Sequence, residues 1–480
     1  MRLSSSSLRQ RTATAPPPRD ASARPLGLFF VVMLMFGITT TLHGLSPLAT
    51  YGLGAVFFLL LAVVGFLLPA GMIAVELATG WDRDGGVFLW ASEAFGKNAG
   101  FFATWLQWFQ DVIFWTVILT GSAAMLALGI GWSEGAENKV YIVAVVLGSI
   151  WFTTAMTGMG LRSSGWVGTV GSLVGTIVPG IALVAFAVIY LSEGHPSNIS
   201  FDVSALVPDL SKAGNLTFAI STILIFAGIE LMGTRVGEIR NPGHTYPRAT
   251  WVAIGMTTIL LVPTVLAIAV LVPRGELNIA AGIVQAIATA FDSVWHIKWV
   301  PALFAIALLI DSIGEIAGWM SGTPIAMATA AREGFLPKRF GRETRGAVPS
   351  MLLGQAIVGS LISVLFIAVP TVRSVFWLLS ALLVQLYLLM YILLFASAWR
   401  LRFTQPNRPR AWRVPGGKVG IAIVSLVGIA FAAAAFVVGF IPPSSLTELT
   451  TAHYLGVLCS ALAVSLGIPL LLMVWRNITP

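Results

Sequence analysis

Long apolar segments separated by short polar connections constrain this chain more than any other feature. Each segment has about 20 residues or more, enough for one helix to cross the roughly 30 Å hydrocarbon core of a bilayer. A soluble domain could not cover so much apolar surface, because 57% of the 480 residues are hydrophobic and only 10% are charged. The sequence therefore predicts an all-α polytopic membrane protein. We predict twelve transmembrane helices, at residues 26–50, 54–79, 100–130, 139–158, 163–191, 214–237, 249–273, 299–331, 348–370, 373–400, 418–442 and 453–476.

The distribution of Lys and Arg predicts which side of the membrane each connection faces. With the N-terminus inside, the cytoplasmic connections hold 23 of the 28 basic residues and the outer connections hold 5. Cytoplasmic loops collect basic residues, so we expect both termini of this multi-pass cell membrane protein to be cytoplasmic. The formal charge of +8 is thus a topology signal, and it gives no support to a nucleic-acid partner.

Three stretches are not simple spans. Residues 1–25 are polar and rich in Ser, Pro and Arg, so we expect a disordered cytoplasmic tail. Trp81–Trp90 mixes charges, paired glycines and aromatic residues, which predicts an interfacial or partly re-entrant loop. Residues 274–298 are expected to form a long outer connection with a short helix through Ile279–Phe291.

Several kinds of chemistry lack the residues they need. The single cysteine, Cys459, excludes an intramolecular disulfide and a cysteine-cluster metal site. The five histidines do not have HExxH spacing, and no GxxxxGK[ST] motif is present to support ATP-driven pumping. Clustered catalytic residues are also missing. We therefore predict no enzymatic activity, no metal and no cofactor.

The stretch Ile225–Gly233 predicts a broken transmembrane helix. Gly228 and Gly233 weaken a helix within an apolar run, and Glu230 places an ionisable group at membrane depth. Backbone that leaves a helix there is tolerated only against protein or a water-filled cavity. The alternative is a tilted, buried helix with a paired glutamate. The turn-forming, basic stretch Asn241–Ala249 is expected to be a cytoplasmic loop.

These residues resemble the amino acid, polyamine and organocation (APC) transporter superfamily. Its sixth helix carries an aromatic, a small residue, Gly, any residue and Glu, followed by NPxxxxPRA, and Phe226–Glu230 and Asn241–Ala249 match this pattern. Three further matching motifs, in the expected order, are Gly85–Trp90, Ala331–Phe340 and Pro415–Lys418. The first of these is most similar to the bacterial glutamate/GABA antiporter subgroup. The resemblance covers nearly all of the chain after residue 25.

The resemblance implies a LeuT-like fold of two inverted five-helix repeats, residues 26–191 and 192–400, followed by two appended helices in residues 401–480. It also implies that helices one and six are interrupted near the middle of the membrane. At such a break, N–H groups at a half-helix end attract a carboxylate, and free carbonyls accept hydrogen bonds from an ammonium. Two facing breaks therefore suit the groups that all α-amino acids share.

The break in the first segment is expected within Ile38–Gly44, where three threonines replace the glycine-rich run common in the superfamily. His43 either projects into the site and selects the substrate side chain, or is a buried histidine bonded to a neighbouring helix. The predicted substrate site combines residues of both breaks. They are Thr39, Thr40, Thr41, Leu42 and His43, with Phe226, Ala227, Gly228 and Ile229.

Five acidic residues lie inside apolar spans, where a charge is costly and an inward-facing role or a partner is expected. They are Glu76, Asp111, Glu230, Asp311 and Glu315. Glu76 lies near the cytoplasmic end of its span and is expected to pair with basic loop residues. Glu230 directly follows the break in segment six and is the main candidate for a gating or coupling group.

Coupling has several candidate residues. Asp111 and Asp311 are additional to the subgroup pattern, whereas Glu315 matches it. Each aspartate either carries a coupled proton or recognises a cationic substrate group, and the alternative is a buried, hydrogen-bonded structural acid. Thr169 stands where several superfamily members carry a lysine in place of a sodium ion. Proton coupling through such a lysine is therefore not expected, and sodium coordination stays open.

The function that these patterns favour is secondary transport of amino acids or related amines by alternating access, with exchange indicated by the subgroup resemblance. A proton- or sodium-coupled symporter is the alternative, followed by a non-transporting nutrient sensor on the same fold. A channel is disfavoured because no filter loop or ring of pore charges is visible. The expected partners are the substrate, the lipid bilayer and a coupling proton or sodium ion. The subgroup resemblance implies a bacterial inner membrane, and neither the particular substrate nor the oligomeric state is predicted.

Overall fold

Helices make up most of the described chain. The computed structural model describes residues 26–208, 225–273, 282–291, 297, 299–344, 347–368, 371–442 and 450–478, and in these ranges it holds no β-strand. Nine helices in them are long and apolar enough to cross a membrane. They span Gly54–Gly80, Lys97–Gly129, Lys139–Gly158, Ser164–Ser192, Pro242–Leu271, Val300–Arg332, Ser374–Thr404, Gly417–Val438 and Thr451–Arg476. The chain is thus an all-helical, multi-pass membrane protein, as predicted.

The individual elements follow the predicted spans closely. They are α1 (Leu28–Thr39), α2 (Leu45–Ala49), α3 (Gly54–Ala62), η2 (Val63–Leu67), α4 (Leu68–Gly80), α5 (Gly86–Phe95), α6 (Lys97–Gly129), η3 (Ser133–Glu137), α7 (Lys139–Gly158), α8 (Leu161–Gly171), η4 (Ser172–Ile177), α9 (Val178–Ser192), η5 (Val203–Ala205), η6 (Leu231–Glu238), α11 (Pro242–Leu271), α12 (Gly282–Ala290), α13 (Val300–Arg332), η8 (Lys338–Gly341), α14 (Pro349–Ala368), α15 (Val372–Thr404), α16 (Gly417–Val438) and α17 (Thr451–Ile478).

Three predicted spans are absent from the nine. The first is divided into α1 and α2, each too short to cross alone. The sixth lies outside the described residues up to residue 224 and continues as irregular backbone and η6. The ninth is the apolar helix α14, which fills most of residues 348–370. The predicted tail at residues 1–25 also lies outside the described residues, and α12 lies within the short helix predicted at Ile279–Phe291.

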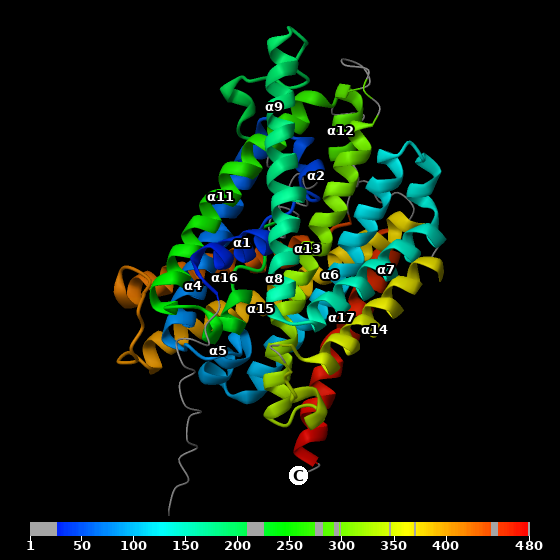
Figure 1. Cartoon of the computed structure of the whole chain (residues 1–480). Coiled ribbons are helices and arrows are strands. Elements are labelled where there is room, and N and C mark those ends of the chain that lie inside the picture. The colour runs from blue at the N-terminus through cyan, green and yellow to red at the C-terminus, as the bar shows by residue number, and fades with distance from the viewer. Residues whose placement is uncertain are drawn as a thin grey trace, which may run out of the picture.

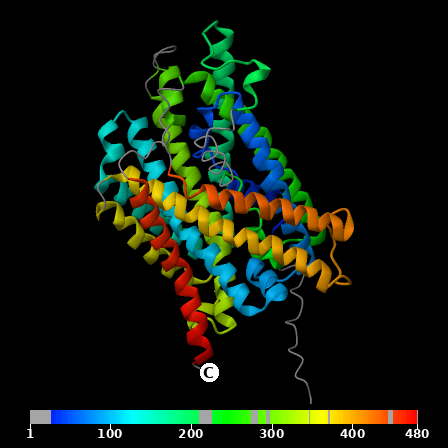
Figure 2. The ribbon, with the colours of Figure 1, turned by 180° about the vertical axis from the view of Figure 1, so that it is seen from behind.

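Helices α6 and α13 form the centre of the molecule, where they pack against each other along their length (Figure 1). Both are 33 residues long and mostly buried. Helix α5 and the C-terminal end of α17 lie at the lower end in Figure 1, and α2 and α12 lie toward the upper end. From behind, α15 crosses the molecule beside α16, and α17 runs down one side (Figure 2).

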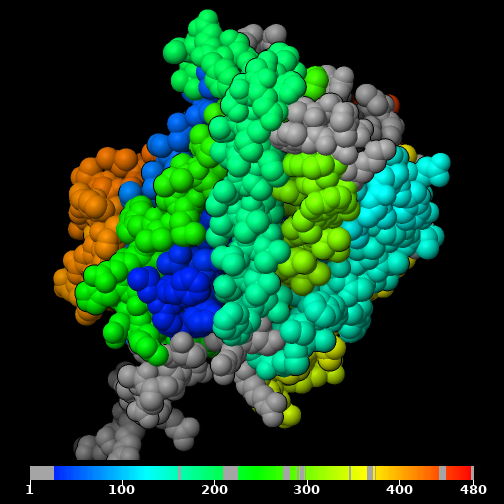
Figure 3. Space-filling model, turned by 45° about the horizontal axis from the view of Figure 1, so that its top comes forward, coloured from blue at the N-terminus to red at the C-terminus, as the bar shows by residue number. Residues whose placement is uncertain are grey.

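Glycines let the strip formed by α8, η4 and α9 lie directly on α13. A Cβ atom on Gly171 would lie 2.7 Å from Gly314 Cα, and one on Gly175 would lie 2.4 Å from Ala307 O. The strip runs the length of the molecule between α11 and α13 (Figure 3). This close backbone approach accounts for the glycine-rich fifth segment.

Two stretches predicted as loops are helical. Trp81–Trp90 was expected to be an interfacial loop, but only Trp81–Gly85 is a turn and α5 begins at Gly86. Asn241–Ala249 was expected to be a loop, but only Asn241 lies outside helix α11. Asn241 takes a left-handed conformation (φ 49°) and Pro242 occupies the first helical position, where its missing N–H costs nothing. The first motif therefore starts a helix between two predicted spans, and the second starts a helix that begins before its predicted span.

Candidate functional site

The first transmembrane segment is interrupted between α1 and α2. Helix α1 ends at Thr39, Thr40 is extended (φ −131°, ψ 108°), and helical structure resumes at Leu45. The hydroxyls of the threonines are engaged nearby, since Thr39 Oγ1 donates to Met35 O at 2.7 Å and Thr40 Oγ1 lies 2.6 Å from Thr257 Oγ1 on α11. The last carbonyls of α1 have no partner further along their own helix and carry the negative end of its dipole.

The sixth segment leaves helical geometry next to this break. Residues 226–230 form turns, and η6 begins at Leu231. Gly228 has φ +104°, a conformation that strongly favours glycine. A Cβ atom at Gly228 would lie 2.5 Å from Ile38 Cγ2 on α1 and 2.8 Å from Trp319 Cζ2 on α13. The two interrupted segments are therefore in direct contact.

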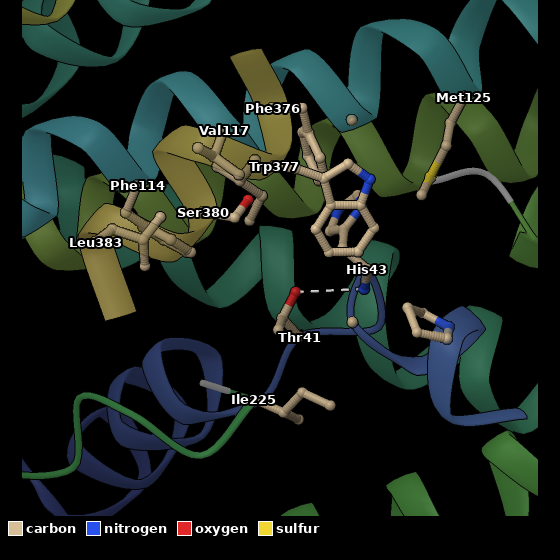
Figure 4. A pocket seen from close by; sticks show the side chains of 14 residues that line it. Thr41, His43, Phe114, Val117, Met125, Ile225, Phe376, Trp377, Ser380 and Leu383 are labelled. Atoms are coloured by element: carbon tan, nitrogen blue, oxygen red, sulfur yellow. Dashed lines mark hydrogen bonds between the residues drawn. The ribbon is translucent and has the colours of Figure 1, made fainter. Parts of the chain in front are cut away.

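A cavity of about 140 Å³ lies beside the two breaks (Figure 4). Thr41 and His43 line it from the first break, and Ile225 lines it from the start of the second. The other walls come from α6 and from the first half of α15. The remaining lining residues are Gly44, Pro47, Phe114, Val117, Ile118, Gly121, Met125, Phe376, Trp377, Ser380 and Leu383.

Only some of the predicted substrate-site residues reach this cavity. Thr41 and His43 line it, and the other seven predicted residues are buried in the packing around the breaks. Those seven are Thr39, Thr40, Leu42, Phe226, Ala227, Gly228 and Ile229. Because they are buried and do not line the cavity, any contact with a ligand there would come from backbone groups.

Glu230 is completely buried, and its described hydrogen-bond partners are all neutral. Its Oε1 accepts from Gln107 Nε2 on α6 at 2.8 Å and from Tyr387 OH on α15 at 2.7 Å. Its Oε2 accepts from Tyr391 OH at 2.5 Å, and the same hydroxyl accepts from Gly228 N at 3.1 Å. Glu230 thus fastens the break in segment six to two helices that also line the cavity.

His43 lies in the cavity wall and also contacts a neighbouring helix. Its side chain lines the cavity (Figure 4). Its Nε2 also lies 2.9 Å from Ser312 Oγ on α13, and Ser312 Oγ lies 2.7 Å from Ser122 Oγ on α6. The histidine is therefore both part of the cavity wall and bonded to a neighbouring helix.

Asp311 and Glu315 lie one turn apart on α13, beside the break in segment one. Asp311 Oδ1 accepts from Thr176 Oγ1 at 2.5 Å, and the Thr41 hydroxyl bonds to the Glu315 carboxyl group. Asp311 Oδ2 and Glu315 Oε2 are buried and find no hydrogen-bond partner among the described residues. Each carboxyl group therefore has an oxygen available to a proton or to another ligand.

Asp111 is held by a different set of hydrogen bonds, which involves α6, α13 and α14. Its Oδ1 accepts from Trp115 Nε1 at 2.8 Å and its Oδ2 from Thr323 Oγ1 at 2.6 Å, and Gln355 Nε2 donates to Thr323 Oγ1 at 3.2 Å. Thr169 Oγ1 bonds to Gly165 O of its own helix at 2.8 Å. In the part of the chain that the structure describes, no group of three or more His, Cys, Asp and Glu side chains could hold a metal ion.

Glu76 pairs with basic residues at the end of α15 and after it, as predicted, and does not line the cavity. Arg402 donates two hydrogen bonds to its carboxylate, and Arg410 Nε lies 3.3 Å from Oε1. Val414 N donates to Oε2 at 2.8 Å. Burial lowers the pKa of the Arg410 guanidinium, whereas the nearby Glu76 carboxylate raises it. Glu76 therefore stabilises the charged form of the desolvated Arg410.

The molecule is closed on the α5 side of the breaks. Arg235 of η6 donates to Ser321 O on α13 and to the Glu238 carboxylate at 3.1 Å. Gly237 N donates to Asp84 Oδ1 at 3.0 Å, which joins η6 to the turn before α5. Polar contacts and close packing thus block access on this side, while the cavity lies on the side of α2.

Four important residues around the site were not predicted. Gln107, Tyr387 and Tyr391 hold Glu230, and Trp319 packs against Gly228 and lies 5.6 Å, between ring centroids, from Phe114. Only a weak indication of the partners of Glu230 was present in the sequence. Two tyrosines one turn apart and one glutamine lie inside apolar spans, where their polar groups need hydrogen-bond partners. Nothing local connects those residues with Glu230.

Comparison with known proteins agrees with this architecture. The model of the amino acid permease family matches residues 26–462. An uncharacterized transporter of Legionella pneumophila is 31% identical over 88% of this chain and 91% of its own length. A glutamate/gamma-aminobutyrate antiporter of Lactococcus lactis is 28% identical over 93% of this chain and 90% of its own. A probable agmatine/putrescine antiporter of the same species is 23% identical over 81% and 82%. The chain therefore belongs to the amino acid permease family of the APC superfamily.

Proposed function

We propose that this protein is a secondary transporter that exchanges amino acids or related amines across a bacterial inner membrane by alternating access. The observation that carries the proposal is the contact between two interrupted transmembrane segments at Thr40–Gly44 and residues 226–230, with a cavity on one side of them and packed protein on the other. Two antiporters among the relatives in Lactococcus lactis support exchange as the transport mode.

The proposed architecture is that of the sequence prediction: twelve transmembrane helices, two inverted repeats at 26–191 and 192–400, and two appended helices at 401–480. Its support is that the first segment and the sixth, which open the two halves, both lose helical geometry. Both termini are placed in the cytoplasm by the distribution of Lys and Arg. The closed side around Arg235 is then cytoplasmic, and the cavity faces outward.

Substrate binding in this proposal uses backbone groups at the two breaks. The last carbonyls of α1, at the negative end of its dipole, receive the ammonium of the substrate. The carboxylate, where present, is held by N–H groups of the interrupted backbone. Glu230 holds the backbone of the second break in place through its hydrogen bonds with Tyr387 and Tyr391. Its role in gating is to keep this backbone in its binding conformation.

Reconstitution tests the proposal directly. Purified protein in liposomes loaded with a mixture of unlabelled amino acids, γ-aminobutyrate and agmatine is expected to take up a labelled member of that mixture. The uptake should cease when the internal solutes are omitted. Binding without uptake would indicate a sensor, and uptake that needs an ion gradient but no internal solute would indicate a symporter.

Ion-coupled symport is a second candidate, favoured by the buried oxygens of Asp311 and Glu315 that lack partners among the described residues. In a proton-coupled symporter, the coupled proton is carried by Asp311, Glu315 or Asp111. In a sodium-coupled symporter, the buried oxygens of Asp311 and Glu315 receive the sodium ion, and Thr169 lies on the adjoining helix α8. Both acids of α13 lie beside the first break, which lets their protonation influence the substrate site.

The Asp311→Asn variant separates these roles. Asparagine keeps the shape of the side chain but cannot carry the acid proton, so uptake driven by an inward proton gradient is expected to fall about tenfold or more, with exchange retained. Proteoliposome uptake with and without the gradient measures this. Asp202→Asn, at an exposed position, is the matched control. Unchanged rate, pH dependence and substrate preference in both Asp311→Asn and Asp111→Asn would remove these acids from coupling.

A further inference from the structure

The cavity next to the two breaks has walls that specify a substrate side chain, and this inference rests on the proposed transport function. If the shared amino acid groups bind at the breaks, the variable part of the substrate extends into the cavity between α6 and α15. The chemistry of that space then decides which substrates are accepted.

The described wall is almost entirely apolar. Of its fourteen residues none is Lys, Arg, Asp or Glu, and the only hydroxyl groups belong to Thr41 and Ser380. His43, the one titratable side chain in the wall, has its Nε2 2.9 Å from Ser312 Oγ, and its Nδ1 is buried without a hydrogen-bond partner among the described residues. A charged substrate group entering this space would leave water without gaining an ionic partner from these residues, which is strongly unfavourable.

The same wall is well suited to an aromatic ring. Phe114, Phe376 and Trp377 present three aromatic side chains from two helices (Figure 4). Phe376 and Trp377 already meet edge to face, with ring centroids 5.7 Å apart. Aromatic rings favour such offset or edge-on neighbours. Leu383, Val117 and Met125 complete the apolar surface.

The volume of the cavity is sufficient for one aromatic ring of a substrate. The cavity holds about 140 Å³, and an apolar protein cavity of about 150 Å³ is known to accept benzene. A phenyl-sized group thus fills the space, whereas a short side chain leaves part of it empty.

We propose that this transporter takes amino acids or amines with an uncharged aromatic side chain, and bulky aliphatic ones less well, and that Phe114, Phe376 and Trp377 select them. The assignment sets the protein apart from its relatives named for glutamate, γ-aminobutyrate, agmatine and putrescine, whose far ends are charged. An aromatic wall can also attract a cation, so agmatine is an essential competitor in the test.

The test is uptake of labelled phenylalanine, leucine, glutamate and agmatine into proteoliposomes loaded with all four unlabelled compounds. Phenylalanine is expected to enter fastest and leucine more slowly, with glutamate and agmatine at least tenfold slower than phenylalanine. Glutamate or agmatine uptake as fast as that of phenylalanine would overturn the assignment.

A failure of transport is distinguishable from a failure of selectivity. If no solute is exchanged, the proposed function is contradicted, and thermal unfolding of the purified protein with each compound then decides the side-chain assignment. Stabilisation by phenylalanine and not by glutamate or agmatine supports the aromatic site. Equal stabilisation by all four, or none by phenylalanine, contradicts it.

Variants locate the selectivity. Trp377→Ala is expected to raise the KM for phenylalanine about tenfold and the KM for leucine much less, because it removes an aromatic neighbour of the ring. Trp377→Phe should recover most of the loss. Phe152→Ala, an exposed aromatic on α7, is the matched control and should leave both KM values unchanged. Equal effects of Trp377→Ala on both substrates would show that the residue only supports the fold.

Discussion

Gly228→Ala is expected to reduce transport at least a hundredfold. The residue has φ +104°, which costs a residue with a side chain roughly 1–3 kcal/mol. The added Cβ atom would also lie 2.5 Å from Ile38 Cγ2 and 2.8 Å from Trp319 Cζ2, so these buried side chains would have to shift. Both neighbours pack against the two breaks, and a shift of about 1 Å there is enough to misplace bound groups. Uptake per amount of protein in proteoliposomes measures the loss.

The control for this prediction is Gly255→Ala in the middle of α11. No atom lies within 4 Å of a Cβ placed on Gly255, so the helix should gain about 0.5–1 kcal/mol and transport should remain at its normal rate. Size-exclusion profiles and melting temperatures of both variants show whether the Gly228 variant is still folded. A folded Gly228→Ala protein with normal uptake would show that the second break does not take part in transport.

The transmembrane helices were the part of the fold most accessible from sequence. Helix α7 begins and ends where it was predicted, at Lys139 and Gly158, and α13 differs by one residue at each end from the predicted span 299–331. An apolar run of membrane-crossing length is a local property, and the bilayer leaves the backbone few alternatives to a helix. Such spans therefore need no knowledge of tertiary contacts.

Helix starts outside the apolar runs were harder to predict. Gly85 (φ 130°) and Gly86 (φ 48°) make the turn that the paired glycines indicated, but α5 follows at once. Its Trp90 is fully buried, although the stretch is mixed in polarity. Similarly, the NPG motif at Asn241 serves as the cap of α11. Turn-forming residues mark the boundary of a helix, and the sequence alone does not say on which side of them the helix lies.

The contents of the site depended on contacts between distant parts of the chain. Glu230 was singled out because an acid at membrane depth is costly, but its partners Tyr387 and Tyr391 lie more than 150 residues away. The loop partners of Glu76 could be predicted as a class, since basic residues gather on one side, but not as Arg402 and Arg410. Sequence patterns thus identify groups that need partners, whereas the fold decides which partners they receive.

Glu76→Gln is expected to cause the largest loss of stability among the changes considered. The carboxylate is 1% exposed and faces Arg402 and Arg410, which are 6% and 8% exposed. Glutamine keeps the size of the side chain but leaves two guanidinium groups without their counter-charge in a desolvated place. Removing one partner of a buried ion pair costs about 3–5 kcal/mol. We expect a large fall in the melting temperature of the detergent-purified protein.

The exposed pair between Lys97 and Glu333 provides the control, because it has a similar charge arrangement without the burial. Lys97 Nζ lies 2.6 Å from Glu333 Oε2, but the side chains are 59% and 38% exposed, so Glu333→Gln should cost only about 0–1 kcal/mol. If Glu76 instead contacts substrate, Glu76→Gln should lose transport at an unchanged melting temperature. The structure favours the first outcome, since the contacts of Glu76 join α4 to the end of α15 and to the connection after it, and Glu76 does not line the cavity.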